Sequence, residues 1–183
     1  MIGRRLVPLL VDAGHDVAGM TRSAPKVDLL REWGALPVVC DVFDRDALVE
    51  AVVDYAPALV MHQLTDLPDD VAELRRSGEA NARIRRHGTR NLLAAASAAG
   101  AGRFIVQSVA WTLPGDSGAA VDEMEQMVLA AGGVVLRYGQ FYGPGTYHEG
   151  QLPDGVRVDI DTAARRTLDA LDAPSGIITI VDE

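Results

Sequence analysis

The chain has 183 residues, 48% of them hydrophobic, and a formal net charge of −9. This size favours one folded domain over residues 1–183 with a sizeable core, and the acidic balance argues against nucleic acid or an anionic membrane as a partner. No apolar run reaches the ~18 residues that span a bilayer. The single cysteine, Cys40, cannot form an internal disulfide, which is typical of a cytoplasmic protein. The arginine-rich composition with one lysine is typical of a GC-rich bacterial genome.

Helices and short strands alternate along the chain. Apolar spacing, helix stops and short apolar runs predict, in order, a helix at 2–13, a strand at 16–20, a helix at 26–33, a strand at 36–40, a helix at 44–54, a strand at 58–61, a mostly helical stretch at 69–99, a strand at 103–107, a helix at 119–131, a strand at 134–137, a helix at 161–171 and a strand at 177–181. Strands that are apolar throughout are buried on both faces, so the pattern predicts an α/β fold with a doubly wound parallel sheet. Loops are expected at 112–118 and 143–155.

The predicted pattern opens with a helix that has no strand before it. In a doubly wound dinucleotide-binding sheet the strand order is 3-2-1-4-5-6, so the first strand is central. Without that strand its two neighbours would lie about 9.6 Å apart, and their facing backbone groups would be unpaired. We therefore expect a Rossmann-like sheet that lacks its usual first strand.

Several short segments, taken in order, resemble the NAD(P)-dependent epimerase/dehydratase branch of the short-chain dehydrogenase/reductase superfamily. These segments are residues 2–6, 20–23, 40–42, 81–92, 106–108 and 136–145. The first turn of that family carries three glycines, and Gly3 matches the third, which lets the helix pack close to the sheet. The resemblance therefore implies an N-terminally truncated member with a reduced substrate region, in which 143–160 is a remnant of the substrate-side loop.

The resemblance also implies a cofactor, NADP, with NAD as the alternative. Arg22 follows the second strand and suits the 2′-phosphate of NADP, while Thr21 stands where an acidic residue would bind the ribose of NAD. Asp41 and Val42 are expected beside the adenine. The competing interpretations are a solvated loop arginine for Arg22 and a turn or helix-capping aspartate for Asp41.

Further residues follow the later strands. Backbone groups of Gln63 and Leu64 are expected to line the nicotinamide ribose, and Arg137 belongs to the segment beside the nicotinamide. Ser108 is the expected catalytic residue, a hydroxyl that orients the substrate; its alternative role is to satisfy the backbone at the end of a strand. His62 is more often structural than catalytic in such a place.

The tyrosine and lysine that perform proton transfer in the family are missing. No Y-x-x-x-K motif occurs in the chain. Glu125 matches the glutamate that usually follows the lysine by four positions, which puts Val121 at the lysine and Ser117 at the tyrosine. The four histidines and Cys40 show no metal-ligand spacing.

Three functions stay open. The first is an NAD(P)-dependent oxidoreductase or epimerase of a small-molecule substrate, NADP(H)-preferring and catalytically impaired in this form, with a homodimer as an option. The second is a non-catalytic nucleotide-binding or sensor module, which the missing tyrosine and lysine favour. The third is a truncated remnant with a compromised fold, which the missing strand favours.

Overall fold

The computed structural model describes residues 1–68, 73–74 and 77–183. Its helices are α1 (Gly3–Asp12), α2 (Val27–Glu32), α3 (Arg45–Tyr55), α4 (Gly78–Arg83), α5 (Thr89–Ala98), α6 (Gly115–Ala130) and α7 (Ile160–Asp169). Its strands are β1 (Ala18–Thr21), β2 (Leu36–Val39), β3 (Leu59–His62), β4 (Arg103–Val109), β5 (Val134–Tyr138), β6 (Gln140–Tyr142), β7 (Arg157–Asp159) and β8 (Gly176–Ile180). Two short turns, the 3₁₀ turn η1 (Ala24–Lys26) and the π turn η3 (Ile84–Gly88), complete the elements that concern the site.

The strands form three parallel sheets. The largest has the order β3-β4-β5-β8, while β1 pairs with β2 and β6 pairs with β7. Among the described residues no strand lies between β1 and β3, so the expectation of a doubly wound α/β fold without its central strand is confirmed.

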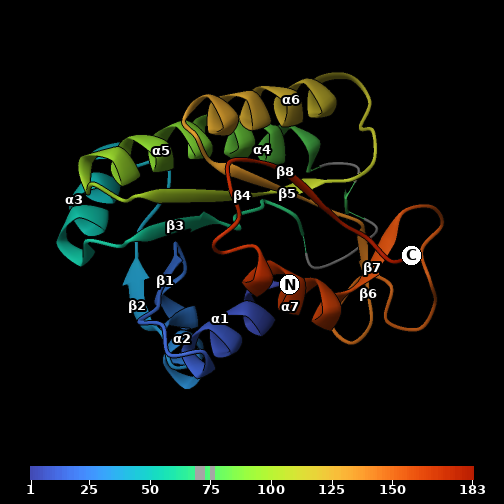
Figure 1. Ribbon diagram of the computed structural model, residues 1–183, viewed down its shortest axis with the longest axis horizontal. Coiled ribbons are helices and arrows are strands. Elements are labelled where there is room, and N and C mark those ends of the chain that lie inside the picture. Colours follow the sequence, from blue (N-terminus) through green and yellow to red (C-terminus); the bar gives the residue numbers. More distant parts are fainter. Residues whose placement is uncertain (69–72, 75–76) are drawn as a thin grey trace.

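Helices cover both faces of the four-stranded sheet (Figure 1). Helices α3, α4, α5 and α6 lie on one face, whereas α1 and α7 pack against each other on the opposite face. On β4, Phe104 and Val106 point into the core under α5 and α6, while Ile105 points into the core under α1 and α7. This alternation explains why the strand is apolar throughout, since each fully buried side chain of this size contributes about 1.5–3 kcal/mol.

Two helices differ from the sequence-based expectation. Helix α6 begins at Gly115, inside the stretch expected to be a loop. A Cβ atom on Gly118 would lie 2.3 Å from the Leu113 carbonyl oxygen, so glycine is required there by a close backbone approach inside the first turns of the helix. The helical stretch expected at 69–99 is resolved as α4, η3 and α5, and its residues 69–72 and 75–76 lie outside the described part.

The loop expected at 143–155 is present and lies between two short strands that were not expected. Strands β6 and β7 flank it and pair with each other in parallel, a pairing that their three-residue length hides in the sequence. The start of the helix expected at 44–54 agrees with the structure, because its side-chain cap is local. The Asp44 carboxylate accepts a hydrogen bond from the Ala47 N–H at 3.2 Å and so caps α3.

Candidate active site at the carboxyl edge of the sheet

Three polar side chains stand in a row where the strands of the main sheet end. His62 closes β3, Ser108 lies near the end of β4, and Arg137 lies near the end of β5. They occupy the same face as Val106 and Val135, because side chains alternate along a strand. The row therefore lies under the layer of α4, η3 and α6, at the edge where open α/β folds bind ligands.

Ser108, Glu125 and Arg137 form one hydrogen-bonded network. The Ser108 hydroxyl donates to Glu125 Oε1 at 2.5 Å, and the Arg137 guanidinium donates to both Glu125 oxygens at 3.0 and 2.5 Å. The Glu125 side chain is buried, and its bonds raise the pKa of Arg137. The sequence offered no acidic or basic partner for Ser108, and the structure corrects this, because α6 brings Glu125 within bonding distance.

His62 is 1% exposed, and only one of its two ring nitrogens has a hydrogen-bond partner among the described residues. Its Nδ1 accepts a hydrogen bond from the Leu64 N–H at 3.2 Å, so in the neutral ring the proton sits on Nε2. Nε2 is buried and has no hydrogen-bond partner among the described residues. Burial, and after it the charge of Arg85, lowers the pKa of His62 to about 4, so the ring is neutral at pH 7.

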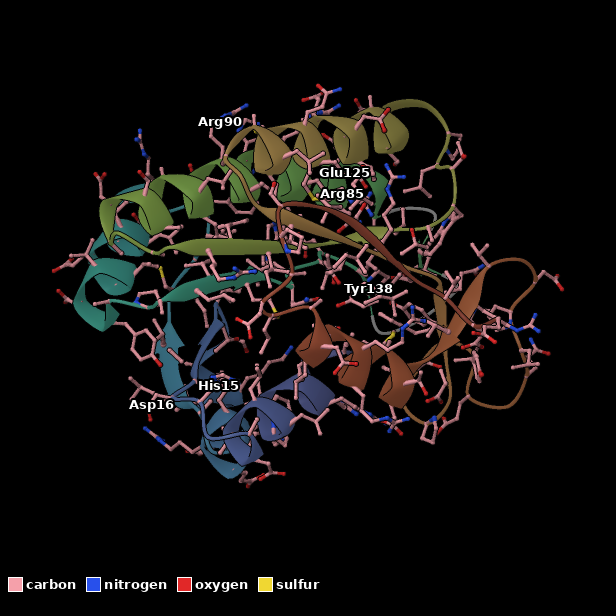
Figure 2. All side chains as sticks on the ribbon, in the orientation of Figure 1. His15, Asp16, Arg85, Arg90, Glu125 and Tyr138 are labelled. Atoms are coloured by element: carbon pink, nitrogen blue, oxygen red, sulfur yellow. The ribbon has the colours of Figure 1, made fainter. Side chains whose placement is uncertain are left out.

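Arg85 is the residue that the sequence did not single out. It lies on the π turn η3, is half-buried, and has no ion pair or hydrogen bond among the described residues. Burial lowers its pKa. In the sequence, the run 83–87 resembles a solvated basic helix face; the π turn, which adds a residue to one turn and shifts the helix face, was not recognisable there. Figure 2 labels Arg85 and Glu125 on the α6 side of the sheet and Tyr138 on the α7 side.

The residues expected to select the cofactor already have partners within the protein. Arg22 Nη2 lies 2.7 Å from Asp66 Oδ1, and the Arg22 side chain is 59% exposed. Asp41 Oδ1 accepts from the Phe43 N–H at 2.9 Å, which is the turn geometry of the competing interpretation. Thr21 Oγ1 accepts from the Ser23 N–H at 3.1 Å. These contacts neither require nor prevent binding of a nucleotide.

The other expected cofactor residues lie in different surroundings. The carbonyl groups of Gln63 and Leu64 both accept from Gln107 Nε2 at 3.2 Å. Val42 is buried in the core. A Cβ atom on Gly3 would meet nothing within 4 Å, so the close helix-to-sheet packing expected at this glycine is absent.

None of the phenols near the edge is placed beside Ser108 as an acid. Tyr138 projects from the opposite face of β5, where its hydroxyl lies 2.6 Å from Thr167 Oγ1 and burial raises its pKa to about 12. Tyr142 lies on β6, and a hydrogen bond with Asp182 raises its pKa. The Tyr147 hydroxyl donates to the Pro68 carbonyl, which ties the 143–155 segment to the chain leaving β3.

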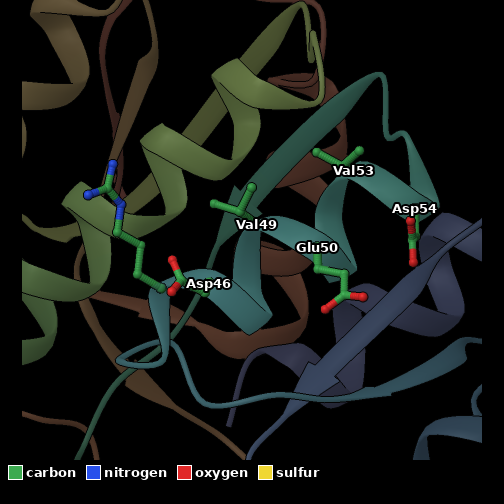
Figure 3. A pocket seen from close by; sticks show the side chains of 6 residues that line it. Asp46, Val49, Glu50, Val53 and Asp54 are labelled. Carbon is green, nitrogen blue, oxygen red and sulfur yellow. The ribbon is translucent and has the colours of Figure 1, made fainter.

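Two surface hollows lie away from this edge. One runs along the outer face of α3 and is lined by Asp46, Val49, Glu50, Val53 and Asp54 together with Arg45 (Figure 3). Within the described residues, no group of three or more histidine, cysteine, aspartate or glutamate side chains is arranged to hold a metal ion. No described helix has the length and apolar character needed to cross a membrane.

A curated relative resembles this chain over nearly its whole length. A 3-diazoavenalumate denitrifying reductase from a Streptomyces species is 35% identical over 206 aligned positions, which cover 96% of this chain. The alignment covers 62% of that reductase, so this chain spans less than two thirds of its relative's length.

The solved structures share the fold. A UDP-glucose 4-epimerase from Thermotoga maritima, solved with UDP-glucose, has a TM-score of 0.79 at 20% identity, covering 99% of this chain and 74% of that one. The Thermus thermophilus UDP-glucose 4-epimerase in complex with NAD gives 0.78 at 19% identity, with the same coverage. A short-chain dehydrogenase from Streptomyces avermitilis gives 0.72 at 16% identity, covering 98% and 84%. The model of the NAD(P)H-binding family matches residues 1–135, and the chain therefore belongs to that family.

Proposed function

We propose that this protein is an NAD(P)H-dependent reductase that removes nitrogen from a small organic diazonium acid. The observation that carries the proposal is the 35% identity to a denitrifying reductase of a diazo acid. The site agrees with it, because Ser117 and Val121 stand where a carbonyl reductase of the resembled family has its tyrosine and lysine.

The reaction explains why those two residues are dispensable. Hydride transfer to a carbonyl produces an alkoxide, which needs a proton from a positioned acid, commonly a contribution of about 10²–10⁴-fold. A diazonium ion is already a cation, so adding one hydride to its terminal nitrogen gives a neutral diazene. The carbon–nitrogen bond of the diazene then breaks, N₂ leaves, and the hydrogen ends on carbon, so atoms and electrons balance. We therefore expect slow or absent carbonyl reduction.

The residues at the edge fit this role. Bound NAD(P)H would supply the hydride, and the exposed guanidinium of Arg22 and the carbonyl groups of Gln63 and Leu64 are the polar groups available to hold it. Because Ser108 donates its proton to Glu125, its oxygen presents lone pairs to the substrate. Lone pairs facing a cationic diazonium stabilise it, and we assign this orienting role to Ser108.

Two finer assignments belong to the same proposal. Arg22 favours NADP(H) by exchanging Asp66 for the 2′-phosphate of the cofactor, since an exposed ion pair contributes only about 0–1 kcal/mol. Residues 1–183 then act as one nucleotide-binding unit, with 143–160 as its substrate-side loop. The Tyr147 contact with the Pro68 carbonyl supports this place for the loop.

The test compares two acceptors in the presence of NADPH. The protein should oxidise NADPH with 4-carboxybenzenediazonium above the protein-free background and form one benzoate per NADPH, while 4-carboxybenzaldehyde gives little or no oxidation. Ser108→Ala should slow the diazonium reaction, whereas Ser97→Ala, on the exposed side of α5, should not. Oxidation no faster than the protein-free background would overturn the proposal.

The second candidate is a nucleotide-binding module without chemistry, which the same Ser117 and Val121 favour. It predicts that NADPH binds in calorimetry while neither acceptor is reduced. The two functions therefore differ in one measurement on the same sample.

A further inference from the structure

We infer that Arg85 and His62 together bind an oxyanion at the carboxyl end of β3. The inference rests on the proposed function for its two anion sources, but it is tested by binding and not by turnover, so the failure of either one can be told from the failure of the other. Two sources share this chemistry: the carboxylate of a small organic acid and a phosphate group of the dinucleotide.

The first argument is the unbalanced charge of Arg85. Three other partly buried arginines pair with a carboxylate: Arg5 Nε lies 3.0 Å from Asp161 Oδ1, Arg86 Nη2 lies 2.7 Å from Asp116 Oδ1, and Arg137 donates to both oxygens of Glu125. Arg85 is half-buried as well, yet none of the described carboxylates lies within ion-pair distance of it. A guanidinium withdrawn from water without an anion is costly, so it is expected where a ligand supplies the charge.

The second argument is the orphaned donor of His62. Its Nδ1 is fixed as an acceptor by the Leu64 N–H, so Nε2 presents a proton inside the protein with no acceptor among the described residues. Buried donors are normally paired, and an unpaired one calls for an explanation. Both groups lie on the same side of the four-stranded sheet: His62 shares its face of β3 with Val60, and Arg85 lies on η3, which packs against α5 and α6. Both groups lack the same thing, a negatively charged acceptor.

The third argument is that nearby Glu125 is already engaged. Its two oxygens accept from Ser108 and Arg137, and these bonds hold the carboxylate on the α6 side of β4 and β5. The described residues therefore supply no hydrogen-bond acceptor for His62 Nε2 and no carboxylate for Arg85. An oxyanion at the end of β3 would accept from Nε2 and from the guanidinium together, with charge-assisted hydrogen bonds that are stronger than neutral ones.

The test titrates the complete chain with three probes: sodium cinnamate, inorganic phosphate and NADP⁺. Calorimetry gives the dissociation constants, and the ¹H–¹⁵N resonance of His62 Nε2 reports whether the imidazole N–H donates a hydrogen bond to the anion. We expect at least one probe to bind and to shift that resonance. A response to cinnamate identifies a small acid as the source, and a response to phosphate or NADP⁺ alone identifies the phosphate.

Variants separate the guanidinium from general charge. Arg85→Gln should weaken the responding probe about 10- to 100-fold, the equivalent of losing one charged hydrogen-bond partner, and Arg85→Lys should restore part of the loss. The control is Arg90→Gln, which removes an exposed arginine five residues further along and should leave the dissociation constant unchanged. Because Arg85→Gln removes an unpaired half-buried charge, its melting temperature should not fall.

Several outcomes would overturn the inference. One is that none of the three probes binds. Another is binding that leaves the His62 resonance in place, which would mean that water alone satisfies Nε2. A third is equal affinity in wild type and Arg85→Gln, provided that the variant shows an unchanged circular dichroism spectrum.

Discussion

Two of the three parallel sheets, β3-β4-β5-β8 and β1-β2, are buried to very different degrees. In the four-stranded sheet Ile105, Val106, Val135 and Leu136 are fully buried, because helices cover both faces. In the two-stranded β1-β2 sheet, by contrast, apolar side chains face solvent: Leu36 and Val39 of β2 are 57% and 55% exposed. The same kind of parallel strand is thus a core element in one half and a partly solvated ribbon in the other.

The two sheets carry different groups of candidate site residues. The polar row of His62, Ser108 and Arg137 stands on the four-stranded sheet, so its geometry is held by packing on both sides. Arg22 and Asp41, which we expect to select the cofactor, follow β1 and β2 of the less buried half. Among the described residues β1 and β3 make no ladder with each other, so the two halves are joined by side chains and by covalent chain.

The largest expected loss of stability comes from breaking the ion pair between Arg137 and Glu125 beside the four-stranded sheet. Arg137→Met leaves the Glu125 carboxylate buried without its cation and should lower the free energy of unfolding by about 3–5 kcal/mol. The matched change in the other half is Arg31→Met, which removes the exposed pair with Asp28 and should cost at most about 1 kcal/mol. Urea unfolding of both variants measures the two values, and equal losses would contradict the comparison.

Truncating a leucine in each sheet should give the next largest difference. Leu136→Ala opens a cavity in the core and should cost about 2–5 kcal/mol. Leu36→Ala changes an exposed side chain and should stay within about 0.5 kcal/mol. The same urea titrations measure both, and a Leu36→Ala loss as large as that of Leu136→Ala would mean that β2 is covered in solution.

The buried histidine predicts a pH dependence that belongs to the four-stranded half. The pKa of His62 is about 4 in the folded chain and about 6.5 when unfolded. Between these values the unfolded chain binds the proton and the folded chain does not, so stability is complete above pH 6.5 and is lost as the pH falls towards 4. The loss should reach about 3 kcal/mol. His62→Gln should abolish this part of the pH dependence, while His15→Gln, at an exposed position, should preserve it; indistinguishable profiles for wild type and His62→Gln would count against the buried neutral ring.

The smallest effect concerns cofactor choice in the less buried half. Asp66→Asn frees the Arg22 guanidinium from its exposed ion pair, so NADP⁺ should bind a few-fold more tightly, an effect of about 1 kcal/mol or less. Arg22→Ala should remove the preference over NAD⁺. Calorimetry with both nucleotides measures the ratio, and an unchanged ratio in Arg22→Ala would remove Arg22 from the site.

The local patterns predicted much of the fold. The apolar runs predicted β3, β4 and β5, because strands packed between helices on both faces admit few other residues. The run at 177–181 predicted β8 as well, although its Ile177 is 45% exposed. Capping also has a local cause, so Asp44 could be predicted as the start of α3. By contrast, β6 and β7 were missed, since a pairing of two three-residue strands depends on the return of the chain through the 143–155 segment and not on their own composition.

The sequence by itself determined the fold class, the missing central strand, and the absence of a tyrosine and lysine at Ser117 and Val121, because each depends on residue type and order along the chain. Only the tertiary structure decided which polar groups face one another. Ser108 and Glu125 are 17 residues apart and meet because α6 packs over β4 and β5. Arg85 is half-buried on the π turn η3, which packs against α6, and the Nε2 of His62 has no hydrogen-bond partner among the described residues, while its Nδ1 accepts from Leu64. These contacts depend on packing between distant elements, which no local pattern encodes.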